Sequence, residues 1–214
     1  MKSIILTAII ICSTILKVFS SGYEEKMGAA IQKMYQSRSE TELTEIADQF
    51  EKIALESEKE WLPGYYAAYS YLSIVINNYN ISSDKKVEIL NKSQEHIEKI
   101  KQIKSDESEI YTLQAFLYLM SIINPEEGYK YSTLANENLT KAEKLNPNNP
   151  RIFYLTALSF LYTPEDFGGG VAVAKPLFVK AEQLFKDESG KDKLLPSWGK
   201  IHNGMMLKQC DEKK

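Results

Sequence analysis

The sequence predicts an all-α fold, a right-handed α-solenoid of about four helical hairpins closed by a C-terminal capping helix. Strand-like alternation is scarce, and glycine and proline gather between periodic segments rather than inside them. One spacing of packing residues also occurs twice, at offsets 0, +4 and +7: it comprises Ala135, Leu139 and Ala142, then Ala174, Phe178 and Ala181. A small, a large and a second small residue on one face let two helices approach closely.

Each of these segments follows a stretch with a signature of its own. The two signatures are Tyr111, Ala115 and Tyr118, and Phe153, Ala157 and Phe160. Paired helices with these features and a period of about 34 residues are typical of the tetratricopeptide (TPR) repeat. The pattern indicates an architecture and a binding function, but it does not identify a ligand.

The first twenty residues predict a secretory signal peptide. Lys2 supplies a positive start, residues 4–16 are mostly apolar, and residues 18–20 suit a signal peptidase site. The apolar run is shorter than the roughly 20 residues that a membrane-spanning helix needs. We expect cleavage after Ser20, one domain over residues 21–214, and no stable membrane insertion afterwards. A retained anchor helix is the alternative, and Cys12 lacks the small preceding residue of a lipidation site.

Charge and cysteine content narrow the class of protein further. The net charge of −3 becomes more negative when Lys2 and Lys17 leave with the signal peptide. The absence of a dense basic run argues against nucleic-acid binding. Cys210 is then the remaining cysteine, so stability must come from packing rather than from an internal disulfide.

Periodicity and turn residues divide the rest of the chain into nine helices. The predicted hairpins cover residues 22–37 and 40–58, 62–79 and 83–103, 106–123 and 126–145, and 149–162 and 170–186, before a last helix over 195–211. Ser39, with Glu42 three residues later, predicts a capping box. The last helix carries an apolar stripe of the kind that covers a solenoid end. The stripe consists of Leu194, Trp198, Ile201 and Met205.

Residues 163–170 form the most unusual local segment. Thr163 and Pro164 predict a short capped turn, and three glycines follow at 168–170. A glycine-rich run before a helix can present N–H groups to an anion, but no Lys-Ser or Lys-Thr follows to complete a P-loop. We interpret the segment as a widened loop. The sequence alone does not decide whether Gly168–Gly170 also has a function.

The titratable residues predict neither catalysis nor a metal site. His96 and His202 lack the converging donors that a metal needs, so we interpret both as surface or packing residues. Cys210 and His202 lie too far apart on one predicted helix to form a catalytic pair, and no GxSxG motif is present. We therefore expect a protein that is not an enzyme and that needs no cofactor.

Several segments together resemble a family of small exported TPR-like proteins of Gram-negative bacteria. They are WLP at 61–63, YYAAY at 65–69, LNPNNPR at 145–151, YTPE with FGGG at 162–170, AKPLF at 174–178 and PSWGK at 196–200. The resemblance implies a TPR fold and export to the periplasm, and it implies no activity. Because the signal peptide specifies only export, the extracellular space stays an alternative location. The loop at 164–169 is also similar to one in periplasmic TPR subunits associated with TRAP solute transporters.

We predict a non-catalytic periplasmic scaffold that binds a peptide or protein partner in its concave groove. The first helix of each TPR pair builds this inner wall. The residues predicted to point into it are Tyr65, Tyr69, Thr112, Phe116, Tyr154, Leu158 and Tyr162. This wall is aromatic and poor in Lys and Arg, so we expect aromatic contacts and tyrosine hydrogen bonds rather than charge pairing.

Two alternatives stay open at this point. The tyrosines could instead pack against each other, or beneath the final helix around Trp198. The protein could also bind a small molecule, as a carrier or as a solute-transport accessory of the TRAP-associated kind.

Overall fold

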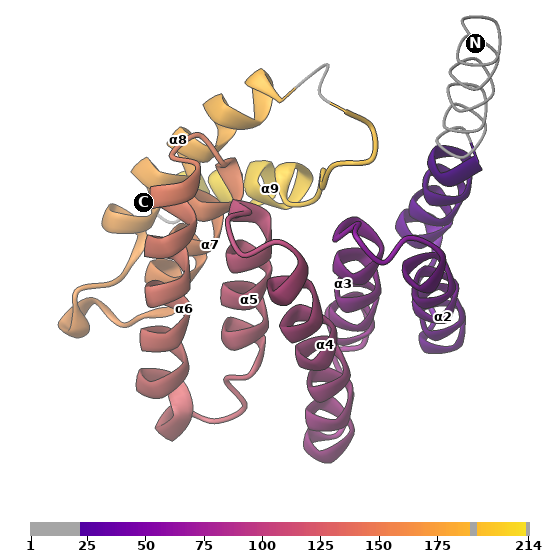
Figure 1. Cartoon of the computed structure of the whole chain (residues 1–214). Helices are drawn as coiled ribbons and strands as arrows, with labels where there is room; N and C mark the ends of the chain where they lie inside the picture. The colour runs from indigo at the N-terminus through magenta and orange to yellow at the C-terminus, as the bar shows by residue number, and fades with distance from the viewer. Residues whose placement is uncertain (1–21, 189–191, 213–214) are drawn as a thin grey trace, which may run out of the picture.

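The computed structural model describes residues 22–188 and 192–212, and these residues contain helices and no strands. Helix α1 is described over residues 22–36. The following helices are α2 (Glu40–Glu56), α3 (Leu62–Asn77), α4 (Ser83–Ile103), α5 (Ser108–Met120), α6 (Pro125–Leu145), α7 (Pro150–Tyr162), the 3-10 helix η1 (Glu165–Phe167), α8 (Val171–Asp187) and α9 (Lys200–Glu212). Successive hairpins stack along the chain to α8, and α9 lies against the C-terminal end of the stack (Figure 1). The predicted α-solenoid is confirmed. None of the helices described is long and apolar enough to cross a bilayer.

Polar residues before the helices set where several of them begin. The side chain of Ser39 accepts a hydrogen bond from the backbone N–H of Glu42, as predicted, and Ser82 and Asn124 cap α4 and α6 in the same way. Such caps satisfy N–H groups that have no partner within the helix. The hairpin boundaries predicted from the sequence therefore lie within a few residues of those observed.

The repeated small–large–small spacing lies at the contacts within hairpins. Ala142 on α6 and Ala181 on α8 are fully buried, and the large residues Leu139 and Phe178 between the small ones are buried with them. The hydroxyl of Ser108 on α5 donates a hydrogen bond to the carbonyl of Ala142, at 3.0 Å. The spacing therefore marks the faces on which α5 meets α6 and α7 meets α8.

Replacing Ala142 or Ala181 with leucine should destabilise the protein by about 1–3 kcal/mol, because the added atoms overpack a filled helix contact. Urea unfolding followed by circular dichroism measures the effect. Glu143→Ala, at an exposed position beside Ala142, is the matched control and should stay within about 0.5 kcal/mol of the parent. Equal stability of Ala142→Leu and the control would contradict this packing register.

The C-terminal helix begins five residues later than predicted. Gly199 adopts a φ of +96°, which ends the preceding segment in a conformation that favours glycine, and α9 starts at Lys200. The predicted stripe is consequently split between two structures. Leu194 and Trp198 are buried in the segment before α9, whereas Ile201 and Met205 are exposed on α9 itself.

A different face of α9 contacts α8. Asn203, Met206 and Cys210 are its buried residues, and the Asn203 amide donates to the carbonyl of Phe178, at 3.1 Å. Lys175 pairs with Asp211 further along, at 2.6 Å. These contacts make α9 antiparallel to α8, and therefore parallel to α7.

The glycine-rich loop closes on itself. The N–H groups of Gly168, Gly169 and Gly170 donate to the carbonyls of Glu165, Pro164 and Phe160, at 2.9, 3.1 and 2.9 Å. Gly168 and Gly170 have φ values of +80° and +94°, which favour glycine. With its N–H groups used internally, the loop is a widened turn rather than an anion cradle.

Gly169→Ala should destabilise the protein by about 1–3 kcal/mol, because the new methyl group would collide with the backbone carbonyl of Thr163. Gly128→Ala on α6 is the control, since a methyl group there meets open space. That change should stabilise the protein by about 0.4–1 kcal/mol through the unfolded state. Thermal unfolding of both variants tests the pair. A Gly169→Ala variant as stable as the parent would show that the loop has no fixed path.

Candidate functional site

Trp198 lies at the centre of the inner wall and fills it from within the chain. Its ring stacks on Tyr69 and Phe116, with centroids 5.5 and 5.1 Å away, and meets the edge of Tyr154 at 6.3 Å. Its Nε1–H donates to the hydroxyl of Tyr65, at 2.7 Å. Residues from α3, α5 and α7 thus converge on one indole from the segment before α9.

The segment before α9 is also fastened to the rest of the solenoid. The hydroxyl of Tyr66 on α3 donates to the carbonyl of Leu194, at 2.9 Å. The guanidinium of Arg151, at the start of α7, donates to the carbonyl of Pro196 and lies 5.5 Å from the centre of the Trp198 ring. The placement of Trp198 therefore depends on several hydrogen bonds as well as on stacking.

Arg151 is a fully buried cation, and two carboxylates compensate its charge. Its guanidinium nitrogens lie 3.0 Å from Glu109 and 3.1 Å from Glu188. Burial opposes the charge of Arg151, but Glu109 and Glu188 outweigh it and raise the pKa of the guanidinium above its ordinary value. Sequence reasoning missed this role, because nothing around Arg151 in the sequence distinguishes it from a surface arginine.

The seven residues predicted to line the groove differ in accessibility. Six are buried, with relative exposures of 9% or less: Tyr65, Tyr69, Thr112, Phe116, Tyr154 and Leu158. Tyr162, at the end of α7, is 74% exposed. As an open surface the predicted groove is therefore reduced to Tyr162. The alternative of packing around Trp198 describes Tyr65, Tyr69, Phe116 and Tyr154. A ligand-binding role for the seven residues stays a prediction.

Burial determines the chemistry of the wall tyrosines. It raises the pKa of Tyr65, Tyr69 and Tyr154 above the usual tyrosine value. Their hydroxyls therefore remain protonated at physiological pH and act as neutral hydrogen-bonding groups.

Exposed side chains on α7 and α9 lie at the ends of this wall, and we call them together the α7/α9 rim: Tyr162 on α7, and Ile201, His202 and Met205 on α9. All four side chains are exposed. The Nδ1 atom of His202 lies 2.8 Å from the hydroxyl oxygen of Tyr154, and the two rings meet edge to face. Partial burial of the ring lowers the pKa of His202, so the imidazole is neutral at pH 7. The sequence prediction for His202, a surface or packing residue, did not anticipate this fixed orientation.

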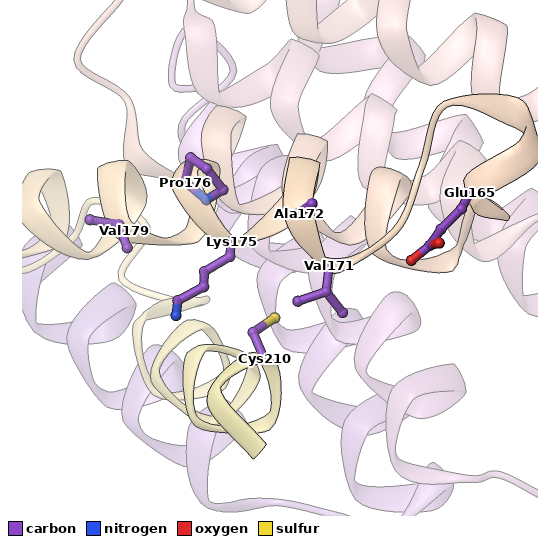
Figure 2. A pocket seen from close by; sticks show the side chains of 7 residues that line it. All are labelled: Glu165, Val171, Ala172, Lys175, Pro176, Val179 and Cys210. Atoms are coloured by element: carbon purple, nitrogen blue, oxygen red, sulfur yellow. The ribbon is translucent and has the colours of Figure 1, made fainter. Parts of the chain in front are cut away.

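A groove between α8 and α9 provides a second open surface, with a volume of about 640 Å³. Figure 2 shows Cys210 projecting from α9 toward Lys175 and Val171 on α8. The full lining is Glu165, Val171, Ala172, Lys175, Pro176, Val179 and Cys210. Because Pro176 has no N–H, the carbonyl of Ala172 lacks its usual donor within α8. Among the described residues, no three or more His, Cys, Asp or Glu side chains are grouped so as to hold a metal ion.

No protein-family model matches this sequence, and no curated protein matches it. Solved structures that are similar to this chain include the following two. The HusA haemophore from Porphyromonas gingivalis has 26% identity and a TM-score of 0.76, over 92% of this chain and 94% of that one. A thermophilic TPR protein from Thermus thermophilus has 16% identity and a TM-score of 0.58, over 89% and 91%, which supports the fold alone. The resemblance to TPR-like proteins is thereby confirmed, and the chain has a TPR-like α-solenoid fold.

Proposed function

We propose that this protein is a non-catalytic carrier that binds a porphyrin such as haem. The observation that carries the proposal is the similarity to the HusA haemophore, which extends over nearly the full length of both chains. It favours the small-molecule alternative over the peptide-binding scaffold predicted first.

The open surfaces suit a flat, largely apolar ligand. Tyr162, Ile201 and Met205 on the α7/α9 rim offer exposed aromatic and apolar side chains to a macrocycle face. The α8/α9 groove falls within the range of about 300–1,000 Å³ that is usual for small-molecule sites. Both surfaces belong to the C-terminal part of the solenoid, so we expect binding there.

Titration with haemin and with metal-free protoporphyrin IX tests this proposal. We expect saturable 1:1 binding, seen as a shift of the porphyrin absorption band and as quenching of tryptophan fluorescence. The fluorescence should respond because Trp198 lies next to the α7/α9 rim, in edge contact with Tyr154. An absence of saturable binding of both compounds at micromolar concentrations would overturn the proposal.

A protein or peptide partner is the second candidate, supported by the TPR-like architecture. TPR solenoids present their inner wall to partners, but here Trp198 occupies that wall. A peptide would therefore have to displace Trp198 or use the rim. Affinity purification from the periplasm, with and without added haemin, separates the candidates. A stoichiometric partner protein bound only without haemin would favour the scaffold.

Export is part of the same proposal. Residues 1–20 lie outside the described residues, so support for a signal peptide comes from the sequence alone. The mature protein should begin at Ser21, and the intact mass of the periplasmic form measures this. A mass that retains residues 1–20, or a lipid adduct on Cys12, would contradict the expectation.

A further inference from the structure

We propose that the Nε2 atom of His202 is an axial ligand of haem iron in this protein. The inference rests on the proposed porphyrin binding and adds the residue that distinguishes an iron porphyrin from a metal-free one. It derives from the hydrogen bond between His202 and Tyr154, and from the exposed apolar side chains around His202.

The Tyr154 hydroxyl leaves the other ring nitrogen of His202 available. Its oxygen, 2.8 Å from Nδ1, can accept a hydrogen bond from Nδ1–H, and this tautomer places the lone pair on Nε2. A second residue that holds Nδ1 and fixes the ring is the usual support of a metal-bound histidine. Tyr154 is itself held by burial, at 4% exposure, and by edge contact with Trp198. The ring of His202 is therefore oriented in advance by the interior wall.

The surroundings of His202 suit a porphyrin better than a bare metal ion. Ile201 and Met205, one residue before and three residues after His202 on α9, are 84% and 57% exposed. The four macrocycle nitrogens supply the equatorial ligands of haem iron, so the protein needs to add only one or two axial ligands. One oriented histidine is therefore enough to ligate haem iron. A bare metal ion would need a cluster of three or more ligands, and the described residues contain none.

The other histidine does not offer the same chemistry. His96 is buried, its Nε2 lies 2.9 Å from a carboxylate oxygen of Glu51, and its ring stacks on Tyr71. It is therefore the matched control for a histidine effect that depends on position.

The test compares haemin with metal-free protoporphyrin IX on the mature protein and its variants. His202→Ala should weaken haemin binding at least about tenfold, and should change the ferric absorption and electron paramagnetic resonance spectra. The affinity for metal-free protoporphyrin, which has no iron to ligate, should fall by a clearly smaller factor. Free imidazole should restore the parent spectrum, and His96→Gln should keep it. Tyr154→Phe removes the oxygen that orients His202. It should weaken the binding of haemin more than that of metal-free protoporphyrin, and by a smaller factor than His202→Ala does.

Three outcomes distinguish ligation by His202 from the proposed porphyrin binding itself. Unchanged haemin affinity and spectra in His202→Ala would overturn axial ligation while leaving porphyrin binding intact. Equal weakening of both porphyrins would also overturn it, since His202 would then only line the site. A parent protein that binds neither compound would instead refute the proposed function.

Discussion

Replacing Arg151 with methionine is expected to destabilise the protein by about 3–5 kcal/mol, the usual cost of removing one partner from a buried ion pair. The change leaves Glu109 and Glu188 without their shared counter-charge, and leaves the Pro196 carbonyl without its donor. It also removes the cation beside the Trp198 ring. Urea unfolding monitored by tryptophan fluorescence and by circular dichroism measures the loss.

Further variants identify the cause. Arg38→Met removes the other arginine, which is exposed and donates to the nearby carbonyls of Tyr35 and Ser37, and it should cost less than about 1 kcal/mol. Arg151→Lys keeps the positive charge but not the planar, forked guanidinium. Its loss of stability should therefore lie between those of Arg151→Met and Arg38→Met. Adding Glu109→Gln and Glu188→Gln to Arg151→Met should recover part of the stability if unpaired charge is the main cost. An Arg151→Met variant as stable as the parent would show that the cluster contributes nothing to folding.

The double variant Tyr65→Ala with Tyr154→Ala is expected to lose at least about 5 kcal/mol, because each change empties a large aromatic volume in the core. Tyr65→Ala also removes the acceptor of the Trp198 indole N–H, and Tyr154→Ala removes an edge contact with the same ring. The two costs should not add simply, since both residues contact Trp198. The melting temperature should therefore fall steeply, or the protein should fail to fold.

Tyr162→Ala is the control within the same set of predicted groove residues. Tyr162 is 74% exposed, so its removal should change stability by less than about 0.5 kcal/mol. If the double variant instead melts near the parent temperature and loses ligand binding, Tyr65 and Tyr154 line an open groove after all. Thermal unfolding and haemin titration of the same samples distinguish these results.

The helices and their pairing were predictable because they are encoded at short range. The offsets linking Ala135 to Ala142 and Ala174 to Ala181 place small residues on one helix face, and that face is buried in the structure. Caps such as Ser39 act within three residues. Patterns that span only a few residues can be recognised in a single sequence. The wall residues were also placed correctly on the first helices of the hairpins, since their spacing follows the same period.

What covers that wall was decided by tertiary structure. Trp198 and Tyr65 are bonded across 133 residues, Arg151 and Pro196 across 45, and Tyr154 and His202 across 48. No helical periodicity extends over such distances, and the late start of α9 depends on one left-handed glycine, Gly199. The sequence by itself determined a TPR-like solenoid with an aromatic inner wall. The path of residues 192–199 decided that the chain fills this wall itself and leaves an oriented histidine at its edge. The physical reason is that hydrogen bonding and desolvation between distant segments depend on their meeting in space, which local spacing does not specify.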